Sequence, residues 1–358
     1  MDNKEKRKRI NAALKKIEKS TGNVFIKTGN KCEPVKFLAT PFDTLNTLIG
    51  GGFPIGKFTT IAGAERTGKG TLIAQTLGHH QIINPDFTCL WTDAEDAIDL
   101  DWMSLHGVDL ERLYVQKYSD DTPNFEKLLD NGIELVRTGA IDMWVIDSVA
   151  ALLPKAEEKK DIHDDSMLDL QRKLPLFFRK ASRFINENCV TTILVGQIYN
   201  VPNANYVQEE VKGGNALKHW AHLRLKTRRG NRLEGPAAVK VMAPDGESRL
   251  IVPGWAQHVK NDKTRINEKE GQEVVLQFVY GRGLDSIAAS ITALMASGEV
   301  ERRGGWYYHE LFPDGKLQGK DAMVTFLKEN TPIRTELTTR MDQRYIQNNL
   351  EIEAIELE

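Results

Sequence analysis

The chain has 358 residues, 41% of them hydrophobic, and its 48 basic and 50 acidic side chains give a formal net charge of −2. This balance provides no overall attraction to nucleic acid or to a membrane, so a polyanion site would have to be a local patch or loop. The chain has no signal-like apolar start, no run of about eighteen uncharged apolar residues and no C-x-x-C spacing, which predicts a cytoplasmic protein without a membrane segment, disulfide framework or zinc site.

The first predicted element is a short amphipathic helix. Residues 1–9 are strongly charged, and apolar side chains then recur at helical spacing up to the break at 20–22; they are Ile10, Ala13, Leu14 and Ile17. This stripe is too small to form a core of its own. The helix must therefore pack on its own domain or on a neighbouring copy, and the sequence leaves both open.

Short apolar runs alternate with longer helical patterns between residues 40 and 233. This alternation predicts an α/β fold with a mostly parallel twisted sheet and helices on both faces. Two expected loops, near 154–171 and 198–212, each follow a predicted strand. Because ligands bind at the carboxyl ends of parallel strands, we expect both loops at the functional edge. The six expected strands are 58–62, 88–92, 113–116, 143–146, 191–195 and 223–225.

The remainder of the chain predicts a smaller second domain. An antiparallel-looking segment at 237–281 precedes a predicted helix at 286–296 and a strand at 306–308, and the acidic and apolar alternation at 351–358 is typical of a solvated tail. The expected organisation is an N-terminal helix and linker at 1–33, a core at 34–280, a small C-terminal α/β domain at 281–332 and an acidic-ended tail at 333–358.

The nine residues after the first predicted strand have the pattern of a phosphate-binding loop. The glycines allow consecutive backbone N–H groups to face an anion, a helix expected to start near Lys69 adds its positive dipole end, and Lys69 is expected to reach the outer phosphates. Gly70 replaces the usual hydroxyl that holds Mg²⁺, and Thr71 supplies a hydroxyl one residue later. The expected nucleotide-binding residues are Gly63, Ala64, Glu65, Arg66, Thr67, Gly68, Lys69, Gly70 and Thr71.

Three further polar residues close predicted strands. Asp147 is placed to hold Mg²⁺ through water, and with Thr71 it forms the expected metal site. Glu95 is placed to polarise a water that attacks the γ-phosphate, although a solvated strand-end carboxylate explains it equally well. Gln197 is placed to sense a γ-phosphate, but taken alone it is better explained as a surface glutamine.

Several strings, in this order, resemble the RecA family of strand-exchange recombinases along most of the chain. They are AALKKIEKSTG at 12–22, DAEDAID at 93–99, DSVAALLPKAE at 147–157, GGNALK at 213–218, VKN at 259–261 and GWY at 305–307. Several rare strings in the right order are more specific than one motif. The resemblance implies a RecA-like P-loop NTPase core, an N-terminal polymerisation helix, ATP and Mg²⁺ as cofactors, and helical self-assembly on DNA.

The resemblance also implies roles for individual residues. Glu95 matches the catalytic glutamate, and Gln197 matches the glutamine that couples ATP to the second DNA loop. Trp102 and Asp99 fall where the family contacts the adenine base. For DNA, the implied contacts come from the first loop and its following helix and from backbone amides at the close of the second loop; they are Met167, Arg172, Arg179, Gly213, Gly214 and Asn215.

Three departures from the family pattern stand out. Gly70 removes the expected metal hydroxyl. The family's Lys-x-Lys pair, which reaches across the filament interface to a neighbour's ATP, is incomplete: Lys260 is present, and Lys263 or Arg265 is the expected second donor. The second loop also carries two tyrosines that either stack on bases or pack against a neighbouring loop, Tyr199 and Tyr206.

The sequence thus predicts an ATP-dependent recombinase that polymerises on single-stranded DNA, pairs it with double-stranded DNA and hydrolyses ATP when DNA is bound. Its expected partners are DNA and further copies of itself, and single-strand binding and loader proteins are further expected partners. Two alternatives remain open. One is a RecA-fold ring helicase, and the other is a nucleotide-switched DNA-binding mediator with weak hydrolysis, for which Gly70 is the main argument.

Overall fold

The structure is a computed structural model that divides into two compact units, Met1–Lys36 and Phe37–Glu358. In the first unit α1 (Asn3–Thr21) confirms the predicted helix. The described residues are 2–21, 34–152, 168–202, 207–211, 214–233, 239–242, 248–251, 254–330, 332–334, 336–338 and 340–341.

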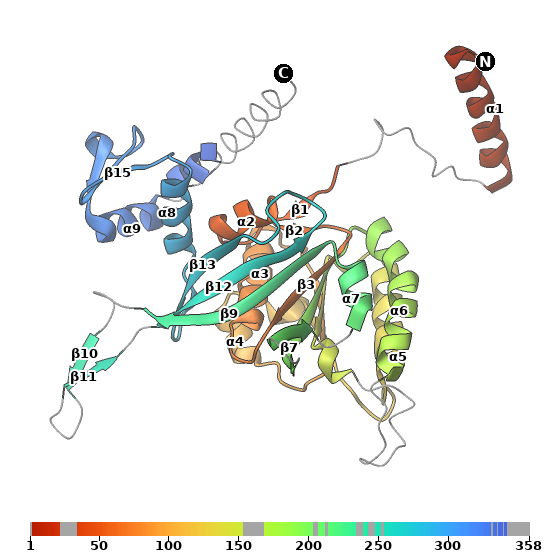
Figure 1. Cartoon of the computed structure of the whole chain (residues 1–358), viewed down its shortest axis with the longest axis horizontal. Coiled ribbons are helices and arrows are strands. Elements are labelled where there is room, and N and C mark those ends of the chain that lie inside the picture. The colour runs from red at the N-terminus through yellow and green to blue at the C-terminus, as the bar shows by residue number, and fades with distance from the viewer. Residues whose placement is uncertain are drawn as a thin grey trace. The chain divides into compact units, whose positions relative to one another are not determined.

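The second unit is built around a ten-stranded sheet with the order β14-β13-β12-β9-β3-β7-β6-β4-β5, in which β8 also pairs with β7 (Figure 1). Its six parallel strands are the six that the sequence predicts: β3 (Phe58–Gly63), β4 (Cys89–Asp93), β5 (Leu113–Gln116), β6 (Met143–Asp147), β7 (Thr191–Pro202) and β9 (Leu223–Arg232). The antiparallel strands are β8 (Val207–Val211), β12 (Gly254–Thr264), β13 (Glu273–Val279) and β14 (Gly283–Leu284).

Helices cover both faces of this sheet, because successive residues of the central strands point to opposite sides. Met143 and Val145 of β6 join one core cluster, whereas Trp144 and Ile146 join the other. The first cluster includes α2 (Asp43–Ile49) and α3 (Lys69–Ile83), and the second includes α5 (Phe125–Arg137), α6 (Leu168–Glu187) and α7 (Gly214–Trp220). Figure 1 shows α5 and α6 side by side.

Short elements complete the core unit. They are β1 (Phe37–Leu38), β2 (Phe53–Pro54), α4 (Leu100–Leu105), η2 (Leu110–Arg112), η3 (Val149–Ala151), β10 (Val239–Met242) and β11 (Ser248–Ile251). None of the helices in the described ranges is long and apolar enough to cross a membrane.

A third apolar cluster belongs to the C-terminal part of the second unit. The predicted helix at 286–296 is α8 (Ser286–Ala296), and the predicted strand at 306–308 is β16 (Trp306–Tyr308). A small antiparallel sheet and a second helix accompany them: β15 (Glu301–Arg303), β17 (Lys316–Gln318), η4 (Pro313–Gly315) and α9 (Gly319–Glu329). The domain boundaries expected at 33, 280 and 332 stay a prediction, and most of the tail lies outside the described residues.

Both expected loops differ from the structure. The helix α6 already begins at Leu168, so the end of the stretch near 154–171 is helical, and 153–167 lie outside the described residues. The stretch 198–212 is not simply a loop, because β7 runs on to Pro202 and pairs antiparallel with β8. The β-branched and aromatic residues Ile198, Tyr199 and Val201 favour a strand, and the prediction of a loop did not take them into account.

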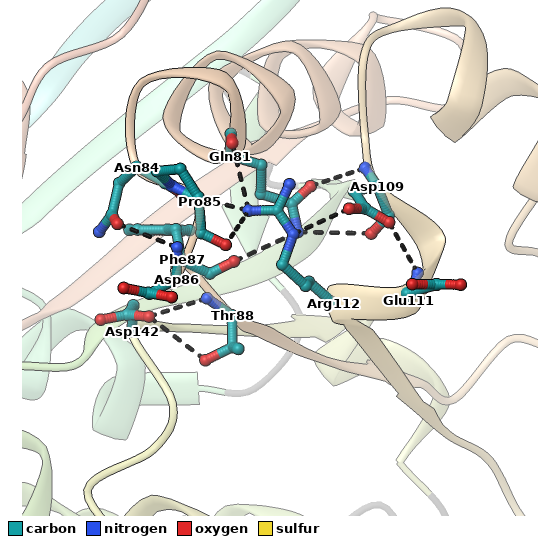
Figure 2. A network of polar contacts seen from close by, with 10 residues as sticks. All are labelled: Gln81, Asn84, Pro85, Asp86, Phe87, Thr88, Asp109, Glu111, Arg112 and Asp142. Carbon is teal, nitrogen blue, oxygen red and sulfur yellow. Dashed lines mark hydrogen bonds and ion pairs between the residues drawn. The ribbon is translucent and has the colours of Figure 1, made fainter.

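The far end of α3 is fixed by one arginine (Figure 2). Arg112 donates to the carbonyls of Gln81, Asn84 and Pro85 at 3.2, 3.2 and 2.6 Å, and its Nε lies 2.9 Å from the carboxylate of Asp109. The last carbonyls of a helix have no partner within the helix, and a cation there also complements the helix dipole. This clamp anchors the helix whose first residue is Lys69.

Candidate nucleotide site

Parallel strand register gathers the candidate residues at one edge of the sheet. Gly63 at the end of β3 lies opposite Gln197 of β7, and Asp93 at the end of β4 lies opposite Asp147 of β6. Since all four strands end on the same side, the phosphate loop, the glutamine and the two acidic strand ends come together. Residues that are more than a hundred positions apart therefore share one site.

The predicted phosphate loop connects β3 to α3, which begins at Lys69. Gly68 has a φ of 79°, a conformation that glycine adopts without strain. A Cβ at Gly63 would lie 2.3 Å from Thr227 Oγ1, so the loop also requires glycine there for space. The hydroxyl of Thr67 donates to the carbonyl of Ala64 at 2.8 Å and closes the turn.

The ammonium group of Lys69 lies across this loop. It donates to the carbonyls of Gly63 and Ala64 at 2.9 and 2.8 Å. Burial lowers the pKa of Lys69, and the nearby carboxylates of Asp147, Glu95 and Glu65 oppose that shift. The lysine therefore places a positive charge among acidic groups, within reach of an anion on the loop.

Glu95, which follows β4, contacts Ser148, which follows β6, and Gln197 of β7. Its Oε1 accepts hydrogen bonds from Gln197 Nε2 at 3.0 Å and from the hydroxyl of Ser148. The turn that carries Glu95 is shaped by Asp93, which is 2% exposed and accepts from the N–H groups of Ala97 and Ile98, both at 3.1 Å. The exposed carboxylate of Glu95 is thus held in a fixed direction.

Asp147 titrates unusually high for an aspartate. Burial and the neighbouring Glu95 raise the pKa of Asp147 to about 7, with Lys69 acting in the opposite direction. Within the described ranges, no group of three or more His, Cys, Asp or Glu side chains is placed to hold a metal ion. The donors fit Mg²⁺ nevertheless, because Mg²⁺ takes one or two carboxylates and completes its shell with water and phosphate oxygens.

The hydroxyl of Thr71 is already engaged. Thr71 is 7% exposed, and its Oγ1 accepts a hydrogen bond from the indole N–H of Trp102 at 3.2 Å. Asp99 accepts from the backbone N–H of Trp102 at 2.9 Å and caps α4, which orients the indole ring. At Gly70, by contrast, an added Cβ would meet nothing within 4 Å. A side chain at position 70 is therefore sterically allowed.

A cavity of about 620 Å³ joins these groups. Its lining includes the loop from Glu65 to Thr71, and Glu95, Asp99, Trp102, Asp147 and Gln197. It also includes four residues that the sequence reasoning missed, Arg229, Trp255, Phe278 and Tyr280. Trp255 and Phe278 stack with ring centroids 4.8 Å apart, and Arg229 donates to the hydroxyl of Tyr280 at 2.7 Å. Arg229 comes from β9, and the antiparallel strands β12 and β13 bring Trp255 and Phe278 here, with Tyr280 directly after β13. No local motif marks these residues.

The predicted interface cations lie on β12 or directly after it. Lys260 is exposed, and it lines a second cavity of about 760 Å³ together with Lys226 and Arg228. Asp262 forms ion pairs with Arg224 and, at 3.3 Å, with Lys226. The remaining candidates differ in exposure: Lys263 is half-buried, whereas Arg265 is exposed and donates to the carbonyl of His219 at 2.6 Å.

The predicted DNA contacts are only partly described. Arg172 and Arg179 are exposed and lie seven positions apart on α6, a spacing that places them on the same face of a helix. Tyr199 lies in β7 opposite Glu210, and Gly214 begins α7. Asn215 follows it in that helix, and Met167, Tyr206 and Gly213 lie outside the described residues.

A glycine-rich loop follows the parallel strand β3 and leads into a helix, and Asp147 ends β6, the second strand along the sheet from β3. These features place the chain in the class of P-loop α/β proteins. The family model of the RecA N-terminal domain matches residues 8–283. Protein RecA of Acinetobacter baylyi is 32% identical over 337 residues, which cover 93% of this chain and 90% of the relative. Protein RecA of Arthrospira platensis is 31% identical over 346 residues, or 95% and 88% of the two chains. The chain therefore belongs to the RecA family.

Proposed function

We propose that the protein is an ATP-dependent homologous recombination protein that forms helical filaments on single-stranded DNA and catalyses homologous pairing and strand exchange, with DNA-stimulated ATP hydrolysis. Membership of the RecA family supports this class of activity. The observation that carries the proposal is the 3.0 Å hydrogen bond from Gln197 to Glu95, because it joins the strand leading into the expected DNA segment to the acidic group beside the phosphate loop.

In this proposal, the loop N–H groups bind the phosphates of ATP and Lys69 holds its outer phosphates. Glu95 orients and polarises the attacking water, and Gln197 senses whether the γ-phosphate is present. Asp147 and Thr71 are the proposed metal-directed oxygens, and Mg²⁺ bound there would neutralise phosphate charge. Thr71 would have to share its hydroxyl between that ion and the indole of Trp102.

The base would bind against Trp102 and Asp99, and Tyr280 lines the same cavity. In a filament, Lys260 and either Lys263 or Arg265 would reach the ATP of the next protomer. Loss of the γ-phosphate would release the contact made by Gln197 and with it the hairpin formed by β7 and β8.

DNA binding would be independent of sequence, because the proposed cations and backbone amides are directed at phosphates and a tyrosine can stack on any base. The proposed contacts are Met167, Arg172, Arg179, Tyr199, Tyr206, Gly213, Gly214 and Asn215. Single-strand binding and loader proteins in the cytoplasm are proposed as further partners.

One observation favours a second candidate function. Gly70 lacks the metal hydroxyl, which suits a mediator that binds ATP and DNA but hydrolyses ATP slowly. The test is ATP hydrolysis with and without single-stranded DNA, strand exchange between homologous DNAs, and electron microscopy of the complexes. Filaments with stimulated hydrolysis and exchange support the recombinase. Filaments without turnover support the mediator, and rings would contradict both in favour of a helicase.

A further inference from the structure

Gln257 of β12 donates a hydrogen bond to the backbone of the phosphate loop. The side chain is 0% exposed, and its Nε2 donates to the backbone carbonyl of Thr67 at 2.6 Å. The strand β12 is separated from β3, which leads into the loop, by β9. We propose that Gln257 is a positioning residue for the nucleotide site, and that it orients the peptide between Thr67 and Gly68; this inference rests on the proposed function.

Peptide geometry gives the contact its consequence. In a planar trans peptide, the carbonyl of one residue and the N–H of the next point in opposite directions. A hydrogen bond that holds the Thr67 carbonyl toward Gln257 therefore directs the N–H of Gly68 the other way. Gly68 lines the cavity described above, so this donor faces the position proposed for the phosphates.

The packing around Gly68 makes this arrangement specific. A Cβ at Gly68 would lie 2.9 Å from Gln257 Nε2 and 3.4 Å from the ring of Trp255. Gln257 can therefore approach the loop this closely only because Gly68 has no side chain. On the same turn, the hydroxyl of Thr67 lies 2.8 Å from Thr227 Oγ1, so β9 and β12 both hold the loop.

A purely structural role explains the residue less well. Gln257 Oε1 is buried and has no hydrogen-bond partner in the described part of the chain. A buried acceptor without a partner disfavours folding. An apolar side chain of the same size would fill the space without that cost. The hydrogen bond from the amide to the Thr67 carbonyl therefore explains why a glutamine is present.

The test compares two buried glutamines. Gln257→Met keeps the volume and removes the donor, and Gln81→Met does the same at a glutamine that is 2% exposed and donates to backbone carbonyls at the far end of α3. For each full-length variant, the affinity for ADP is measured by calorimetry in EDTA, and Tm is measured by thermal unfolding. Gln257→Met is expected to weaken ADP binding on the order of tenfold, with Tm unchanged or raised. Gln81→Met should lower Tm and leave ADP affinity unchanged.

The inference would be overturned if folded Gln257→Met bound ADP with wild-type affinity. It would also be overturned if Gln257→Met and Gln81→Met changed ADP affinity and Tm by the same amounts. If Gln257→Met does not fold, Gln257→Glu carries the test, because an ionised carboxylate of nearly the same shape opposes the Thr67 carbonyl. Its ADP affinity at about pH 8 should then fall below that of wild type, and an unchanged affinity would contradict the proposal. A wild-type protein that binds no ADP would instead contradict the proposed function itself.

Discussion

The indole N–H of Trp102 donates to Thr71 Oγ1 at 3.2 Å, so one hydroxyl lies between the expected base wall and the expected metal position. In the usual form of the loop, a hydroxyl on the residue directly after the lysine serves the metal. Here the residue directly after Lys69 is Gly70, so the nearest following hydroxyl belongs to Thr71.

Gly70→Ser should therefore strengthen the dependence of ATP binding and turnover on Mg²⁺. An added Cβ meets nothing within 4 Å, so the serine fits without rearrangement. The measurement is a Mg²⁺ titration of ATP hydrolysis and of ATP affinity. Gly70→Ala is the matched control, because it adds the Cβ without the hydroxyl, and equal curves for the two variants would show that a hydroxyl at this position has no effect.

Glu95→Gln should lower the rate of ATP hydrolysis by roughly a hundredfold or more, because a general base is removed. The amide oxygen of the glutamine can still accept from Gln197 and Ser148, so ATP and DNA binding should persist and filaments should last longer. Single-turnover hydrolysis and filament lifetime by electron microscopy measure this. The control is Asp96→Asn, a neighbouring exposed carboxylate; hydrolysis by Glu95→Gln at the wild-type rate would remove Glu95 from the catalytic role.

The contribution of Asp147 to the stability of the ligand-free protein should fall as pH rises toward neutrality, because folding raises the pKa of Asp147 from 3.8 to about 7. The unfolded chain releases this proton first, so the contribution of Asp147 is fully present below about pH 4 and is lost as pH rises through about 7. Asp147→Asn should remove this dependence.

The Tm of Asp147→Asn should accordingly exceed that of wild type by a margin that grows from about pH 5 to about pH 8. Asp130→Asn is the control, since its carboxylate is 58% exposed and pairs with Lys180 at the surface. A constant difference in Tm across this range would show that Asp147 titrates as an ordinary aspartate.

Arg112→Met should reduce the free energy of unfolding by roughly 1–3 kcal/mol, because three carbonyls at the end of α3, two of which belong to exposed residues, lose a charged donor. ADP affinity should change little, since the clamp lies at the opposite end of α3 from the phosphate loop. Denaturant unfolding measures the change. Arg137→Met, at an ion pair with both partners at least 50% exposed, should cost less than about 1 kcal/mol; equal losses in the two variants would refute the capping role.

Most of the local structure and the identity of the motif residues could be predicted from the sequence. Hydrophobic periodicity located the six parallel strands, and the spacing of Gly63, Gly68 and Lys69 defined the loop between β3 and α3. These features depend on neighbours within a few positions, so they can be predicted without knowledge of the tertiary structure. The hairpin of β7 and β8 was missed although its paired residues are close in sequence, because the stretch after the predicted strand at 191–195 was interpreted as a loop.

Only the tertiary structure decided which polar groups share a contact. The bond from Gln197 to Glu95, the bond from Trp102 to Thr71 and the support of Thr67 by Gln257 each join segments at least thirty-one positions apart. Such pairs depend on strand order and register, which are set by the packing of two helical layers on one sheet. A residue such as Gln257 carries no local pattern, and its role is visible only where β12 approaches the phosphate loop.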